Sequence, residues 1–332
     1  MKQKNKYKMV MITVTAGCCL AVLMGLCLGA AWLSPKELYN AVFGGISTPE
    51  GRIFYYARLP RTIACLLAGA GLATSGAVIQ GVLANSLASP GIIGVNAGAG
   101  LGVTICCALG AISGWAIAGS AFAGAFFAVL TVAAAAQKTR ASRSAVILGG
   151  VAVNSLLTAI SEGITTLFPE VGLLTSDFRT GGFSGVAVSR LWPAGIMILV
   201  ALVVVFHLSN ELDLLSMGEE TAQGLGLSVR KMRTVFLVLA ALLAGASVSF
   251  AGLLGFVGLI IPNIARQIVG GESRKMLPLC ALGGAMFVTL CDCASRVLFA
   301  PYEVPAGIIM SVIGAPFFIF LLFKRKGGHS RG

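Results

Sequence analysis

The chain has 332 residues, of which 57% are hydrophobic and only 11% are charged. A soluble protein carries about a quarter charged residues because its surface must contact water, so this composition excludes a soluble enzyme and a disordered chain. The apolar residues form repeated blocks of roughly 20, each long enough to cross a bilayer as a helix, and the short alternating segments of a β-barrel are absent. We therefore predict an all-α polytopic membrane protein. Its formal net charge of +12 then requires no nucleic-acid partner.

The apolar blocks between charges and helix breakers predict about ten membrane crossings. They run from about Met9 to Leu33, Arg61 to Val82, Ile92 to Leu109, Trp115 to Ala136, Ala145 to Phe168, Leu191 to Leu208, Thr234 to Phe250, Leu253 to Val269, Met276 to Leu298 and Pro305 to Phe323. Pro262 interrupts the eighth, and we expect it to break that helix. Residues 1–332 then form a single transmembrane domain with short tails at 1–8 and 324–332.

The positions of Lys and Arg predict the orientation of these crossings. Seventeen of the 24 basic residues fall in segments on the N-terminal side of the membrane, in five separate groups. The other side holds Lys36, Arg52, Arg58, Arg61, Arg179, Arg190 and Arg296. The positive-inside rule therefore places both termini in the cytoplasm, as an even number of crossings requires.

The basic N-terminus and the apolar run after it resemble a signal peptide. The run is longer than the apolar region of such peptides, and no soluble segment follows Ala30 and Ala31, so we expect a retained first helix. The nine cysteines fall almost wholly inside the predicted crossings. We interpret them as buried apolar residues, with neither a disulfide framework nor a metal site, and we expect no cofactor.

Several catalytic motifs are missing from the chain. It has no Walker A sequence, and no Gly is followed by Lys anywhere, so it cannot bind ATP through a P-loop. Gly182 to Gly185 match the serine motif of an intramembrane protease, which needs a nearby histidine. His207 lies about 30 Å away along the next helix, and His329 is in the tail. The sequence therefore predicts a pore or a carrier.

Polar and small residues inside the crossings suggest packing or a translocation path. Gly94, Gly98 and Gly102 form a stripe that favours close helix packing over a role in a pore. Asp292 has a neutralising partner one helical turn away in Arg296, whereas Glu162 faces either a water-filled cavity or the outer interface. Candidates for lining a path are Gln80, Asn96, Asn154, Ser155 and Glu162, and hydrogen bonding between helices remains an alternative for each.

The longest polar inner segment, residues 209–230, lies between the sixth and seventh crossings. Ser216 or Gly218 can cap a short helix whose first turn holds Glu219 and Glu220, and Gly224 or Gly226 can end it. A short exposed helix of this kind is either a docking element or a solvated connector.

Several long motifs, in order along almost the whole chain, resemble those of the FecCD-type permeases. These are the membrane subunits of type II ABC importers for iron–siderophores, haem and cobalamin. The segments are Arg58-Leu-Pro-Arg61, Ala68 to Gly81, Asn85 to Val95, Gly218 to Leu227, Ala251 to Arg266, Glu303 to Gly307 and Ile313 to Phe317. The chain departs from the family pattern at Asn263, where His is usual, at Ser86, where Pro is usual, and in the outer segment from Phe178 to Ser184.

The resemblance implies partners and site residues. It implies a dimer of permeases, homodimeric rather than heterodimeric, with two cytoplasmic ATPase subunits and an extracytoplasmic binding protein, in a bacterial cytoplasmic membrane. The coupling segment 209–230 would contact the ATPases, and the residues implied in coupling are Gly218, Ala222, Leu225, Gly226, Pro262 and Arg266. Arg58, Arg61 and Arg296 would dock the binding protein.

Alternatives remain open both for the cargo and for the class of transporter. An iron–siderophore is the commonest cargo that the resemblance implies, with haem and cobalamin as alternatives. An ion-coupled secondary carrier, with Glu162 and Asp292 as ion sites, is the alternative from another class, and a membrane-bound transferase is a distant third.

Overall fold

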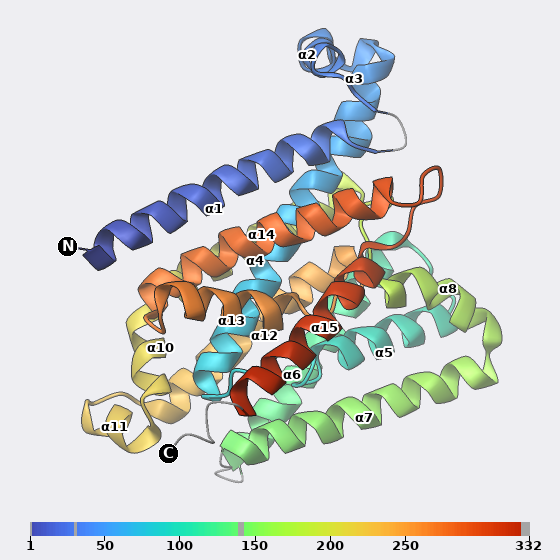
Figure 1. The fold of residues 1–332 in the computed structure, drawn as a ribbon. Helices are drawn as coiled ribbons and strands as arrows, with labels where there is room; N and C mark the ends of the chain where they lie inside the picture. The colour runs from blue at the N-terminus through green and yellow to red at the C-terminus, as the bar shows by residue number, and fades with distance from the viewer. Residues whose placement is uncertain (1, 30–31, 139–142, 327–332) are drawn as a thin grey trace.

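The computed structural model describes residues 2–29, 32–138 and 143–326, and within them the regular structure is entirely helical (Figure 1). The helices are α1 (Lys2–Cys27), α2 (Pro35–Gly44), η1 (Gly45–Ser47), α3 (Pro49–Ile53), the π-helical turn η2 (Phe54–Arg58), α4 (Leu59–Val82), α5 (Val95–Ala108), α6 (Gly114–Lys138), α7 (Arg143–Leu167), α8 (Pro169–Thr180), α9 (Val188–His207), α10 (Ser209–Ser216), α11 (Glu219–Gly224), α12 (Val229–Ala251), α13 (Val257–Val269), α14 (Ser273–Val297) and α15 (Ala306–Lys326). Arg140 and the end of the tail, with His329 and Arg331, lie outside the described residues.

The predicted crossings correspond to long apolar helices. In the described part of the chain seven helices are long and apolar enough to cross a membrane, and one of them runs unbroken from Pro49 to Val82. The shorter apolar helices are α5, α13 and the Ala306–Phe320 part of α15. Together they account for each of the ten predicted crossings, and the all-α polytopic prediction is confirmed.

The prediction that Pro262 breaks the eighth crossing is wrong. α13 begins at Val257 and continues through Pro262 to Val269. A proline inside a helix leaves the carbonyl four residues earlier without its N–H donor. Here that carbonyl belongs to Gly258, and it accepts a hydrogen bond from Nε2 of Gln80 at 3.3 Å. The neighbouring helix α4 thus supplies the missing donor.

Several short helices outside the crossings were not predicted. α2 begins with a capping box, in which the Ser34 side chain accepts from the Glu37 N–H and the Glu37 carboxylate accepts from the Ser34 N–H. α8 begins with Pro169 at its first position, where a missing N–H does no harm. Both sequences carry clear helix-start signals, but the helices are too short to register as crossings.

The two ends of the bundle differ in what they carry. α1 begins, and α15 ends, toward the end where α10 and α11 lie, and α2 and α3 lie at the opposite end (Figure 1). We call these the inner end and the outer end. The shared location of the first and last helices agrees with an even number of crossings; that the inner end faces the cytoplasm stays a prediction of the charge distribution.

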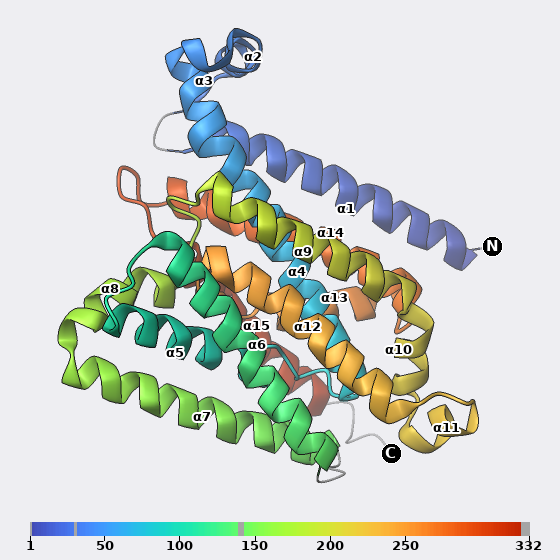
Figure 2. The ribbon, with the colours of Figure 1, turned by 180° about the vertical axis from the view of Figure 1, so that it is seen from behind.

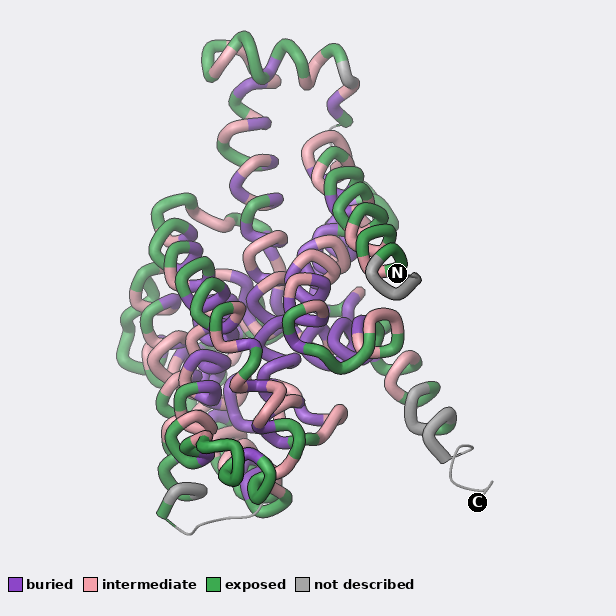
Figure 3. The backbone as a smooth tube through the Cα atoms, turned by 90° about the vertical axis from the view of Figure 1, so that its left-hand side faces the viewer, coloured by how far each residue is buried: buried purple, intermediate pink, exposed green. Residues whose placement is uncertain are grey.

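The core of the bundle lies around α4, α12 and α14, and α1 and α7 lie at its periphery (Figure 2). Figure 3 shows the buried residues gathered in the middle of the bundle. A Cβ on Gly69 would lie 2.2 Å from the Gly284 carbonyl oxygen, so α4 and α14 approach closely because both positions are glycine. The predicted glycine stripe packs within the chain: a Cβ on Gly98 or Gly102 would lie 2.3 Å from a backbone oxygen of α6. All nine cysteines are free, and six are buried.

Candidate functional site

The inner segment between α9 and α12 contains the predicted short helix. α11 spans Glu219–Gly224, with Gly218 before it at φ +122° and Gly226 after it at φ +83°. Ala222 is fully buried and anchors the helix, while the Leu225 side chain is 62% exposed. An ion pair between Glu219 and Arg233 ties α11 to α12.

A second helix, α10, connects this segment to the bundle. Asp213 accepts hydrogen bonds from the Ser273 N–H at 2.9 and 3.2 Å, which caps the start of α14. Nη2 of Arg143, at the start of α7, donates to the Leu215 carbonyl oxygen at 2.8 Å. The inner segment is therefore bonded directly to α7, α12 and α14.

Gln80, Pro262 and Arg266 form one arrangement near the inner end, in which Gln80 and Pro262 are buried. Arg266 donates through Nη1 to Oε1 of Gln80 at 3.1 Å, and Nε2 of Gln80 bonds the carbonyl that Pro262 releases. Gln80 is only 2% exposed and its amide is bonded at both ends, so within this chain it makes hydrogen bonds between α4 and α13. A cavity of about 250 Å³ lies beside it, between the ends of α4, α10 and α13.

Two of the departures from the family pattern contact each other. Nδ2 of Asn263 donates to the Ser86 carbonyl oxygen at 2.8 Å, and also to the Leu259 carbonyl oxygen at 2.8 Å. The bond joins α13 to the loop that follows α4. The third departure lies at the outer end, where Ser184 donates to Oε2 of Glu303 at 3.3 Å. Ser184 precedes the start of α9, whereas His207 is the last residue of that helix.

The predicted docking arginines meet around one buried carboxylate. Asp292 has no exposed surface and forms ion pairs with Arg296 on its own helix and with Arg61 on α4, the latter at 3.0 Å. Nη1 of Arg296 also donates to the carbonyl oxygens of Gly25 at 3.0 Å and Leu28 at 3.2 Å. Arg58 donates to the same Leu28 oxygen at 2.6 Å. The predicted pairing of Asp292 with Arg296 is confirmed, and Arg61 is a partner that the sequence analysis missed.

This network changes the interpretation of the three arginines. Arg296 is fully buried and Arg58 is 7% exposed, so neither side chain forms an exposed rim in the described structure. The Arg61 side chain is 14% exposed and also pairs with Glu303 at 2.7 Å. Burial alone would raise the pKa of Glu303, but the hydrogen bond and charge of Arg61 outweigh it and hold that pKa below its ordinary value.

The remaining path candidates lie on α5 and α7. Asn96 and Asn154 are half-buried, whereas Ser155 and Glu162 are exposed on α7. Seven residues separate Ser155 from Glu162, so both lie on one face of that helix. Within the described residues, the side-chain hydrogen bonds of Gln80 go to Gly258 and Arg266 and to none of these residues.

A bundle of apolar helices with an exposed inner segment bonded to three of them suits a membrane permease that another protein drives. The FecCD transport family matches residues 17–324, and the chain belongs to this family. It is the permease subunit of an ABC importer and a multi-pass protein of the bacterial cytoplasmic membrane.

Relatives and solved structures agree with this assignment. The chain is 38% identical over 309 residues to the vitamin B12 import system permease protein BtuC of Escherichia coli O17:K52:H18, covering 92% of each chain. It is 37% identical over 311 residues to the same permease of Citrobacter koseri, again covering 92% of each. A solved structure described as an inward-facing conformation of a putative metal-chelate type ABC transporter matches with a TM-score of 0.85 and 28% identity, covering 96% of this chain and 99% of that one.

Proposed function

We propose that this permease imports a metal chelate as a homodimer, with two ATPase subunits at its inner end and a binding protein at its outer end. The relatives are vitamin B12 permeases, which supports a cobalamin-type corrinoid as the first cargo to test. The metal-chelate transporter supports the wider class, in which the iron–siderophore favoured by the sequence analysis also belongs.

The observation that carries this proposal is the exposed helix α11. Leu225, directly after the helix, is exposed to solvent, while Ala222 is buried and holds the helix to the bundle. The ion pair of Glu219 with Arg233 joins it to α12. An apolar side chain exposed on a polar inner segment is suited to a cleft on a partner protein. Movement of an ATPase bound there would reach α7, α12 and α14.

A reconstituted transport assay tests the proposed function. The permease, an ATPase and a binding protein from the same operon are placed in liposomes, and uptake of radiolabelled cobalamin and of a ferric siderophore is measured with ATP inside. We expect uptake of one chelate that needs both ATP and the binding protein. Uptake driven by an ion gradient without ATP would identify a secondary carrier instead.

Replacing Leu225 by Glu tests the coupling helix. We expect the ATPase to co-purify at least about tenfold less well, because a charge would enter an apolar contact at the centre of the interface. Leu225→Glu is preferable to a change at Gly226, whose φ of +83° strains any other residue. The matched control is Leu173→Glu on α8 at the other end, which is 78% exposed and should leave co-purification unchanged. Equal co-purification of the two variants would contradict the assignment.

Docking of the binding protein at the outer end is proposed through Arg61. It has exposed surface and pairs with Glu303, which lies in a loop and is itself one-third exposed. A carboxylate of the binding protein could replace Glu303 on the guanidinium, since Arg binds carboxylates in this planar geometry. Arg58 and Arg296 would position Arg61 indirectly. Both donate to the Leu28 carbonyl oxygen, and Arg296 shares Asp292 with Arg61.

A further inference from the structure

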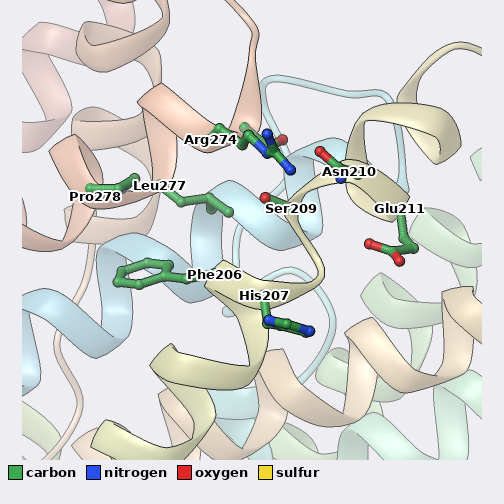
Figure 4. Close-up of a pocket in the computed structure, with 9 residues that line it drawn as sticks. Phe206, His207, Ser209, Asn210, Glu211, Arg274, Leu277 and Pro278 are labelled. Carbon is green, nitrogen blue, oxygen red and sulfur yellow. The ribbon is translucent and has the colours of Figure 1, made fainter.

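Two cavities adjoin at the inner end, where α9 turns into α10 beside the start of α14. One is a polar pocket of about 390 Å³, lined by His207, Ser209, Asn210, Glu211 and Arg274 among others (Figure 4). The second is an apolar groove of about 560 Å³, lined by Val203, Val204, Phe206, His207 and Leu208. Phe206 and His207 line both, so the pocket and the groove lie side by side.

The polar pocket holds opposite charges that do not neutralise each other. Arg274 is exposed and forms no ion pair within the described residues, and the same holds for Glu211. Oε2 of Glu211 is buried without a hydrogen-bond partner. Figure 4 shows the Glu211 carboxylate pointing away from the Arg274 guanidinium. A buried carboxylate oxygen without a donor is costly, so this oxygen is suited to accept a hydrogen bond from a ligand in the pocket.

Ser209 lines the same pocket and is 3% exposed. It begins α10, whose first turn has no side-chain cap, so its first N–H groups lack side-chain acceptors. These donors lie with Arg274 in one pocket, which suits a phosphate group.

We propose that the pocket and the groove bind a phosphatidylethanolamine from the inner leaflet. Arg274, the Ser209 hydroxyl and the start of α10 would hold the phosphate. The free ammonium would donate to Oε2 of Glu211, and an acyl chain would lie in the groove. Ser209 and Glu211 lie at the start of the segment 209–230, but none of the single residues implied in coupling or docking lines this site, so the inference goes beyond the proposed function.

The surroundings identify a lipid rather than a soluble ligand. Next to the groove the exposed side of α9 is apolar, and Leu199, Val200 and Val203 on it are each more than half exposed. α9 is a crossing of 20 residues, so its last turn lies at the depth of the headgroups. An apolar surface leading into a polar pocket at that depth matches a phospholipid in both shape and polarity.

The charges also select among phospholipids. A choline headgroup carries three methyl groups on its nitrogen and cannot donate a hydrogen bond to Glu211. A phosphatidylglycerol has no cation and would leave the Glu211 carboxylate beside a second negative charge. Phosphatidylethanolamine alone among these three offers both a phosphate and an ammonium donor.

Native mass spectrometry of the full-length permease with synthetic lipids tests the proposal. The purified chain is titrated with phosphatidylethanolamine, phosphatidylcholine and phosphatidylglycerol of identical acyl chains. We expect phosphatidylethanolamine to bind about fivefold more tightly than phosphatidylcholine, the ratio that one partly exposed ion pair can supply. This comparison needs no variant, so a folding defect cannot obscure it. Equal binding would show nonspecific lipid association, and preferred binding of phosphatidylglycerol would show an anion site; either result overturns the proposal.

Two charge-removing variants assign the headgroup contacts. Glu211→Gln should abolish the preference for phosphatidylethanolamine over phosphatidylcholine, and Arg274→Gln should weaken binding of both lipids by a similar factor. Glu170→Gln and Arg52→Gln make the same changes at the outer end and should leave the preference intact. A preference that survives Glu211→Gln would refute the proposed contact.

Discussion

At the scale of single residues, Asp292 organises the outer end of the bundle. It is fully buried and pairs with Arg296 and Arg61, and the arginines reach on to backbone carbonyls at the end of α1. Removing one partner of a buried ion pair leaves an uncompensated charge in a medium of low dielectric constant. The residues that were predicted to bind a partner therefore also hold α1, α4 and α14 together.

We expect Asp292→Asn to destabilise the permease by about 3–5 kcal/mol, because Arg296 and Arg61 would lose their buried counter-charge. The measurement is thermal unfolding of the purified protein in detergent. Adding Arg296→Gln to Asp292→Asn should restore part of the loss, since it removes one of the two uncompensated charges. Asp177→Asn, on the exposed surface of α8, is the control and should unfold like the unmodified protein. An unchanged unfolding temperature for Asp292→Asn would show that the network contributes nothing to stability.

Glu303 is expected to compete with the binding protein for Arg61. Glu303→Gln should strengthen docking about threefold to fivefold, mainly through a faster association that depends on salt, because it frees the guanidinium. Surface plasmon resonance with the immobilised permease measures both rates. Glu170→Gln removes the same charge without touching Arg61 and should have a smaller effect. Identical kinetics for the two variants would place the docking site elsewhere.

At the scale of the helix, α13 shows how a proline is accommodated in the core. The carbonyl of Gly258 loses its helical donor at Pro262 and gains the Gln80 amide from α4. The other end of that amide accepts from Arg266. One glutamine therefore joins two helices and satisfies a carbonyl and a guanidinium together.

A double-mutant cycle on Gln80 and Pro262 tests this compensation. Gln80→Leu should cost about 1–3 kcal/mol, because it leaves the Gly258 carbonyl buried without a donor. Pro262→Ala restores a backbone N–H at that position, so Gln80→Leu should cost less in the Pro262→Ala background. Thermal unfolding of the four proteins gives the coupling. If the cost of Gln80→Leu is the same in both backgrounds, Gln80 does not replace the missing donor.

At the scale of the whole molecule, α7 remains largely uncovered. Only 17% of its most apolar stretch is buried, and its exposed face carries Ser155 and Glu162 as well as apolar residues. Polar residues on an exposed crossing are suited to a water-filled path or to a second subunit. We therefore propose that this face lines the path between two copies.

Cysteine accessibility distinguishes these environments in the assembled transporter. In a background without native cysteines, Ser155→Cys and Glu162→Cys should react with a membrane-impermeant thiol reagent, because they face water in the path. Gln80→Cys should stay unreactive because the position is buried, and Leu199→Cys because it is exposed to lipid. The rate of labelling is measured by mass spectrometry. If Ser155 and Glu162 react no faster than Leu199, α7 faces lipid rather than the path.

The sequence by itself determined the class of fold, the crossings and the short helix α11. Hydrophobicity, helix caps and breakers act over a few residues, so they can be recognised in the chain, and the pair of Asp292 with Arg296 lies within one helical turn. Tertiary structure decided the rest. Arg61 reaches Asp292 across 231 residues of sequence, Asn263 meets Ser86 across 177, and Gln80 meets Gly258 across 178. These contacts depend on which helices pack together at glycine-sized spacings, and no local pattern in the chain specifies that.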